Sequence, residues 1–217
     1  MDTLLYYDRA IDSTLLAALS KIAAQQTNGT SAITEVCHQL LEYVAMHPNV
    51  GIRYHACIII LAAHTNASYL SEQGGESQSA SHFYLTNIRM TRISNNGTIH
   101  TLSSIIKHIM SSAWWEAKLA TLYYGYKLAA SKQTTLKELG HIQPSTSVTT
   151  DNVTAQGLTM GMITPKASKS MDQRFHWHIC YNTQCQFHNL WCKGILNCAE
   201  YSSKHHPPNH HWNVRKF

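Results

Sequence analysis

Hydrophobic positions recur with helical spacing in the first quarter of the chain. Residues 12–25 and 33–46 place apolar side chains three or four residues apart, which is typical of amphipathic helices. Ser13 or Thr14 is expected to cap the first helix, and the sequence HPNVG to end the second. The pattern therefore predicts an N-terminal two-helix appendage.

Strand-like runs replace the helical pattern from residue 51 onward. Two strands joined by a tight connection are predicted over 51–56 and 57–66, with a polar loop at 71–81. A strand at 82–90, a turn at Asn96-Gly97 and a strand over 98–109 complete a group of consecutive antiparallel strands. The long apolar pattern at 112–130 predicts a helix on one face of that sheet.

The remaining chain alternates between helix and strand signals. Helices are predicted at 136–141, 152–160, 168–184 and 197–204, and strands at 145–151 and 186–194. Alternation of this kind adds parallel strands to a sheet and places helices on its faces. We therefore expect an α/β domain with a sheet of mixed direction.

Composition and charge narrow the function classes only slightly. Charged residues make up 13% of the 217 residues, and the net charge of +5 would suit a polyanion but also an ordinary solvated surface. No apolar run reaches the length of a membrane span, and the acidic N-terminus does not resemble a signal peptide. We expect a cytoplasmic or nuclear chain that is not secreted, with its six cysteines as reduced thiols.

Two groups of side chains suggest chemistry but also have plain structural readings. Zinc ligation competes with ordinary packing for His176, His178, Cys180, Cys185, His188, Cys192 and Cys198, whose spacing matches no zinc finger or knuckle. Base stacking competes with core packing for Trp114, Trp115, Tyr123, Tyr124 and Tyr126. Packing is the favoured interpretation of both groups.

Polar residues at predicted strand ends give the sharper signal. Asp151 ends a strand and is followed by a helix start, so it is either a helix cap or a ligand of a divalent cation. Asn66 ends another strand, where a carboxylate would have completed such a site. Glu116 and Glu200 lie on helices from which they could contribute.

Seven ordered motifs give the chain a resemblance to a known family. They are LLYYDRAIDSTLLAALSKIAAQQ, ASYLSEQGG, MSSAWWEAKLATLYY, QTTLKELGH, TDNVTAQG, KSMDQRFHW and NCAEYSSKHHP. In this order they resemble the C-terminal end of a copia-type LTR-retrotransposon polyprotein, namely the tail of the reverse-transcriptase connection followed by ribonuclease H. The resemblance implies a ribonuclease H-like mixed five-stranded sheet, with its first three strands antiparallel and helices on its faces.

The resemblance also implies domain limits, an activity and a partner. Residues 1–50 would be the connection tail, 51–204 the ribonuclease H-like domain and 205–217 a loose C-terminal tail. The family hydrolyses the RNA strand of RNA–DNA hybrids with two Mg²⁺ ions held by four carboxylates. RNA–DNA hybrid or duplex nucleic acid is therefore the expected partner, and no membrane is.

Carried over residue by residue, the resemblance keeps two of the four carboxylates. Asn66 replaces the Asp of an H-S-D-A-S-Y-like motif, and Lys118 replaces the second Glu of an E-A-E-L-like helix next to an extra residue at Trp114-Trp115. Asp151 and Glu200 remain as acids at the other two positions. We expect weak or absent Mg²⁺ binding and impaired or lost catalysis. The alternatives are a non-catalytic nucleic-acid-binding module, a genomic remnant with no selected role, and an active nuclease in which Glu116 serves through a shifted helix.

Overall fold

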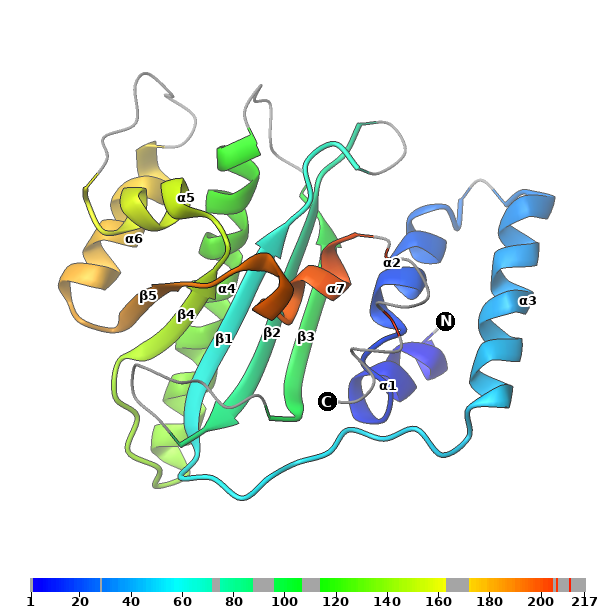
Figure 1. Ribbon diagram of the computed structural model, residues 1–217, viewed down its shortest axis with the longest axis horizontal. Coiled ribbons are helices and arrows are strands. Elements are labelled where there is room, and N and C mark those ends of the chain that lie inside the picture. Colours follow the sequence, from blue (N-terminus) through cyan, green and yellow to red (C-terminus); the bar gives the residue numbers. More distant parts are fainter. Residues whose placement is uncertain are drawn as a thin grey trace.

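The computed structural model describes residues 2–27, 29–71, 75–87, 96–106, 114–162, 172–204, 206 and 211, without the side chains of 114–115, 172–175 and 178. Within these ranges the chain forms a five-stranded sheet with helices on both faces and a helical unit at one edge (Figure 1). No helix among these residues combines the length and the apolar character needed to cross a membrane.

The sheet has mixed direction and the strand order β3-β2-β1-β4-β5. Its strands are β1 (Ile60–Ala67), β2 (Gln78–Thr86), β3 (Thr98–Ile105), β4 (Thr146–Thr150) and β5 (Phe187–Trp191). The first three strands pair antiparallel, whereas β4 runs parallel to β1 and β5 runs parallel to β4. The predicted fold class, an α/β mixed five-stranded sheet whose first three strands are antiparallel, is confirmed.

Alternation along β1 divides the core between the two faces of the sheet. Helices α4 (Trp114–Glu138), α5 (Val153–Thr159) and α6 (Asp172–Thr183) share one face with β1, β2, β4 and β5. Their common core contains Leu61, Ala63, Phe83, Leu122, Tyr126, Ala129, Val148, Ala155 and Phe187. The opposite face receives the short turn η1 (Gly194–Leu196) and α7 (Ala199–Ser203), which contacts β1 and β2.

Three helices, not two, form the N-terminal unit. They are α1 (Asp2–Ala10), α2 (Leu16–Ala24) and α3 (Ser31–Met46), and they enclose Leu15, Leu19, Ile22 and Leu40. The unit packs at the β3 edge, where α1 and α2 contact β3 and the Ser20 hydroxyl donates to the carbonyl of Ser103 at 2.8 Å (Figure 1). Helix α1 was not predicted, and the predicted cap of the next helix is wrong. Helix α2 begins at Leu16 with Leu15 at its N-cap and no side-chain cap, while the Asp12 Oδ1 atom accepts from the backbone N–H of Thr14 just before it. The proposed division at residue 50 stays a prediction.

The strand predicted over 51–56 is wrong, and the next strand begins at Ile60. Both edges of β1 are already paired, with β2 and β4, so the sheet offers no place beside β1 for another strand. Side-chain amides hold the segment instead: the Asn96 Oδ1 atom accepts from the backbone N–H of His55, and the Asn87 Oδ1 atom accepts from that of Ile58. Strand β2 in turn begins at Gln78, inside the predicted polar loop.

The two helices predicted at 112–130 and 136–141 are one helix, α4, which continues to Glu138. The Thr134 and Thr135 hydroxyls donate to carbonyls four residues earlier, and the Gln133 side chain donates to the carbonyl of Pro144. These bonds satisfy the polar stretch without interrupting the helix. Gly140, with a φ of +89°, follows the end of the helix.

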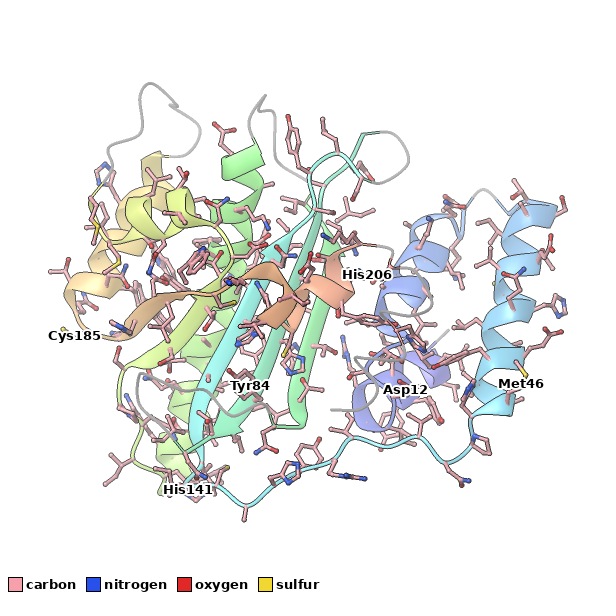
Figure 2. All side chains as sticks on the ribbon, in the orientation of Figure 1. Asp12, Met46, Tyr84, His141, Cys185 and His206 are labelled. Atoms are coloured by element: carbon pink, nitrogen blue, oxygen red, sulfur yellow. The ribbon has the colours of Figure 1, made fainter. Side chains whose placement is uncertain are left out.

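Two residues of the segment expected to be a loose tail are held in place. The His211 imidazole lies between the hydroxyls of Tyr43 on α3 and Tyr201 on α7. His206 lies beside α7 (Figure 2). It stacks on Tyr201 and contacts the carbonyl of Glu200. The expectation of a loose tail over 205–217 stays a prediction, with these contacts observed at two of its residues. The predicted strand ends at 88–90 and 107–109 and the predicted helix starts at 112–113 and 168–171 lie outside the described residues.

Candidate functional site

The candidate site lies where β1 and β4 end side by side. The two strands are parallel, with Thr65 opposite Thr150, so the next residue of each strand, Asn66 and Asp151, reaches the same edge of the sheet. Asn66 is 3% exposed, and its amide nitrogen donates to the Ser203 hydroxyl at 2.8 Å. Its Oδ1 atom faces the beginning of α4.

Lys118 on α4 joins these two residues. Its ammonium group lies 2.8 Å from the Asp151 Oδ1 atom and also donates to the Asn66 Oδ1 atom. The side chains of Lys118 and Asp151 are only 14% and 20% exposed. One ammonium group therefore bridges two of the positions that the resemblance assigns to metal ligands.

Asp151 is fixed by its backbone as well as by its side chain. The carbonyl of Asp151 accepts from the indole N–H of Trp191 at 3.0 Å. Asp151 is not the cap of α5, because the Asn152 Oδ1 atom accepts from the backbone N–H of Ala155 at 2.8 Å. The carboxylate of Asp151 is consequently available to Lys118, and the helix-cap interpretation of this residue is wrong.

Glu200 comes to the same place from the other face of the sheet. A Cβ atom added at Gly194 would lie 2.9 Å from the Glu200 Oε2 atom and 3.7 Å from the Asp151 Oδ2 atom. The two carboxylates thus face one small space that only a glycine leaves open. Glu200 forms an ion pair with Lys204, four residues later on the chain.

The side chains of His64 and Asn197, to which the sequence assigned no role, hold α7, and with it Glu200, against β1. The His64 Nδ1 atom accepts from the backbone N–H of Cys198 at 2.9 Å, and the Asn197 amide donates to the carbonyl of Thr65 at 3.0 Å. Because a backbone N–H can only donate, His64 is the neutral tautomer with its proton on Nε2, 3.0 Å from the Tyr84 hydroxyl. Burial, with a smaller effect of His82, lowers the pKa of His64 to about 3. In the sequence, only the short polar run at the end of the strand predicted over 57–66 indicated that residues here could have such roles.

Glu116, the less favoured candidate, is buried and lies two residues before Lys118 on α4. Two residues correspond to about 200° around a helix, so the two side chains leave α4 on nearly opposite sides. Use of Glu116 in place of position 118 would require a rotation of the helix start.

The histidines and cysteines of the zinc alternative are dispersed over several elements. Cys180 lies on α6, Cys185 lies in the turn between α6 and β5 (Figure 2), and Cys198 directly precedes α7. Among the described residues, no three His, Cys, Asp or Glu side chains are grouped as metal ligands. All six cysteines are free thiols, and burial raises the pKa of Cys192 and of Cys198 to about 11.

The aromatic residues of α4 are divided between core and partner helices. Tyr126 is fully buried and stacks on Phe187, while the ring of Tyr123 packs against Trp177 of α6. The side chains of Trp114 and Trp115 lie outside the described part. Core packing thus accounts for Tyr126, where base stacking had been the alternative.

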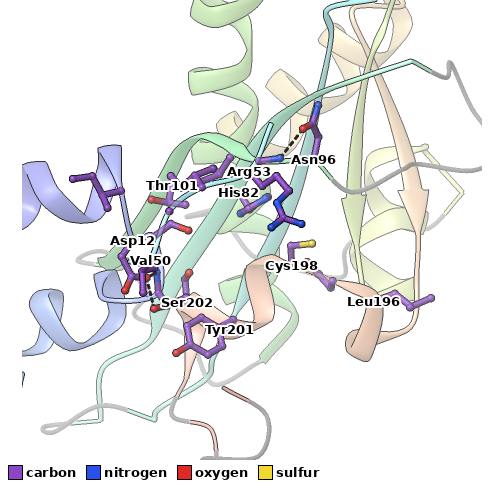
Figure 3. A pocket seen from close by; sticks show the side chains of 18 of the residues that line it. Asp12, Val50, Arg53, His82, Asn96, Thr101, Leu196, Cys198, Tyr201 and Ser202 are labelled. Atoms are coloured by element: carbon purple, nitrogen blue, oxygen red, sulfur yellow. Dashed lines mark hydrogen bonds between the residues drawn. The ribbon is translucent and has the colours of Figure 1, made fainter. Parts of the chain in front are cut away.

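A cavity of about 220 Å³ lies beside the site, between the N-terminal unit and the sheet (Figure 3). The α1–α2 turn, residues 50–53, strands β2 and β3 and the segment 194–202 line it. Asp12, Arg53 and His82 are among the titratable residues that line it, and burial lowers the pKa of His82 to about 4. Gly194 lines this cavity and also lies beside the carboxylates of Glu200 and Asp151.

The residues present do not fit the two-magnesium site that the resemblance implies. Mg²⁺ requires several hard oxygen ligands, and two ions need shared carboxylates between them. Here the Oδ1 atoms of Asn66 and Asp151 already bind an ammonium group, and an amide and a lysine stand where two carboxylates would be needed. The donor set is that of a hydrogen-bonded ion-pair network.

Comparison with known proteins gives similarity of structure only. No family model and no curated protein matches the chain. The N-terminal RNase H domain of Rv2228c from Mycobacterium tuberculosis is 12% identical, with a TM-score of 0.46 over 73% of this chain and 97% of that one. LC11-RNase H1 in complex with RNA/DNA hybrid is 13% identical, with a TM-score of 0.43 over 63% and 88%. The foamy viral protease-reverse transcriptase in complex with double-stranded DNA is 16% identical, with a TM-score of 0.36 over 76% and 30%.

Proposed function

We propose that the chain is a ribonuclease H-like domain of a copia-type retrotransposon polyprotein that binds RNA–DNA hybrid or duplex but has lost most or all of its hydrolytic activity. The motifs support the family, and the sheet agrees with the fold that they imply. The contact of the Lys118 ammonium with both Asn66 and Asp151 is the observation that carries the loss of activity.

Each replaced position removes a different requirement of the family reaction. Asn66 keeps the shape of an aspartate but not its charge, and its amide is engaged with Ser203. Lys118 adds a positive charge, and like charges about 4 Å apart repel by about 4 kcal/mol at an effective dielectric constant of ~20. Asp151 and Glu200 remain as the acidic members, each paired with a lysine.

Restoring the family pattern tests the proposal. The double variant Asn66→Asp/Lys118→Glu is expected to recover Mg²⁺-dependent cleavage of a labelled RNA–DNA hybrid, whereas either single variant recovers little, because ligands of one site act as a unit. The same variant with Asp151→Asn is the matched control and should be inactive. Circular dichroism spectra of all variants would serve as the control for folding.

Cleavage by the unmodified chain, abolished by Asp151→Asn, would contradict the proposal and favour the alternative in which Glu116 serves as a ligand. If the double variant folds but stays inactive, the residues at positions 66 and 118 do not suffice to explain the loss of hydrolytic activity.

Binding is tested separately from cleavage. Fluorescence anisotropy with a labelled hybrid at several salt concentrations should give an affinity that falls steeply with salt, as expected for contacts to phosphates. No binding at low salt would favour a genomic remnant without a selected role.

A further inference from the structure

Every acidic side chain at the matched positions has a lysine partner. Asp151 pairs with Lys118 and Glu200 pairs with Lys204, so these four side chains carry no net formal charge. The Lys118–Asp151 pair is mostly shielded from solvent, at 14% and 20% exposure. Salt screens such a pair less than it screens an exposed one.

This balance changes how the site meets a phosphate group. Carboxylates without counter-ions repel a phosphodiester, which is why a site built from them needs cations before it can hold nucleic acid. In this chain the counter-ions are the lysine side chains themselves. A divalent ion at the Asp151 Oδ1 atom would have to displace an ammonium group that also donates to the Asn66 Oδ1 atom.

We propose that the Lys118 ammonium group is the resident cation of this site, so that the domain holds nucleic acid without a divalent metal. The nucleic-acid part of this inference rests on the proposed function, while the exclusion of metal rests on the ion pair alone. Lys118 is a positioning residue here: it fixes Asp151 and Asn66 and neutralises the former.

Hybrid binding with and without metal tests the first part. We would measure anisotropy of a labelled RNA–DNA hybrid in EDTA and in MgCl₂ at matched ionic strength, for the unmodified chain and for Lys118→Met. The unmodified chain should bind equally well in both. Lys118→Met should bind at least about fivefold more weakly in EDTA and regain affinity with Mg²⁺, since metal and hybrid are then coupled ligands.

Lys127→Met is the matched control, because Lys127 is an exposed lysine of the same helix. Its effect should be equal in EDTA and in MgCl₂. A requirement of the unmodified chain for Mg²⁺, or a Lys118→Met variant that is insensitive to metal, would overturn the inference.

A metal titration tests the second part of the inference, that Lys118 excludes a divalent ion. This test is independent of hybrid binding, whose absence would contradict only the proposed function. Calorimetric titration with MnCl₂ should detect binding to Lys118→Met that is at least about tenfold tighter than to the unmodified chain, a difference of about 1.4 kcal/mol. Equal binding by both would show that Lys118 does not exclude the metal.

A measurement on the unmodified chain covers the case in which Lys118→Met does not fold. Limited acetylation followed by mass spectrometry should modify Lys118 much more slowly than Lys127, with or without MnCl₂. Faster modification of Lys118 when MnCl₂ is added would mean that metal displaces its ammonium group, and the inference would then be wrong.

Discussion

The Cγ2 atom of Thr65 lies 2.7 Å from the position that a Cβ atom would take at Gly125, so the central strand and α4 approach at the distance that only a glycine permits. This approach brings the start of α4, and Lys118 with it, within reach of the end of β1. Packing in the middle of the sheet therefore contributes to the geometry of the site.

Gly125→Ala should destabilise the fold. Alanine favours a helix over glycine by about 1 kcal/mol, but overpacking of a core usually costs about 1–3 kcal/mol, so the clash with Thr65 should win. Urea denaturation measures the difference. Thr65→Ser removes the Cγ2 atom and keeps a hydroxyl for the Thr149 carbonyl, so the double variant should recover stability. Additive losses in the double variant would show that the two side chains do not interact.

Asn197→Ala should release α7 from the sheet. Asn197 is 4% exposed, donates to the carbonyl of Thr65 and accepts from the backbone N–H of Ala199. Loss of a buried hydrogen-bond partner costs about 1–3 kcal/mol. Hydrogen exchange of residues 198–203 should accelerate more than exchange of β1. Unchanged protection of α7 would place the anchor elsewhere, with His64 the next residue to test.

Stability should fall in acid because two buried histidines stay neutral in the folded chain. Burial lowers the pKa of His64 to about 3 and that of His82 to about 4. A lowered folded pKa gives stability that is present above the unfolded value of about 6.5 and is lost as the pH falls toward 4 and then 3. Urea denaturation between pH 7 and pH 4 measures this loss. A constant free energy of unfolding over that range would contradict it.

Asp8 should act in the opposite direction. This carboxyl group in α1 is fully buried, and burial, with a smaller contribution from Asp12, raises its pKa to about 7. A raised folded pKa gives stability that is complete below the unfolded value of about 4 and is lost as the pH rises through 7. Asp8→Asn should therefore stabilise the chain at pH 8, by roughly 2–4 kcal/mol, since each pKa unit is worth about 1.4 kcal/mol. It should also steepen the loss of stability in acid, and a parallel shift at all pH values would argue against titration of Asp8.

Thr146→Val should stabilise the sheet. Thr146 on β4 is fully buried, and its hydroxyl has no hydrogen-bond partner in the described part of the chain. Valine has nearly the same shape and removes an uncompensated polar group, a gain of about 1 kcal/mol. Thr98→Val is the matched control, because the Thr98 hydroxyl lies within hydrogen-bond distance of the carbonyls of Phe83 and His100. Thermal denaturation should show opposite shifts, and a loss for Thr146→Val would indicate a partner for its hydroxyl.

The sequence by itself determined the features that depend on neighbours along the chain. Helical spacing predicted α3, and the order of strand and helix signals from residue 60 onward predicted a mixed sheet, because side-chain periodicity is a local property of the backbone. Local signals also placed Asn66 and Asp151 at the ends of strands. The same signals predicted a strand at 51–56, because they do not reveal that both edges of β1 are taken.

Only the tertiary structure decided what the site is. Lys118 meets residues that lie 52 positions before and 33 positions after it, and Asn66 bonds to Ser203 across 137 positions. Gly194 leaves the space that Asp151 and Glu200 share, a role that its own sequence neighbours do not indicate. Strand pairing and helix packing set these distances, and their energies come from contacts between segments far apart in the chain, so periodicity cannot encode them.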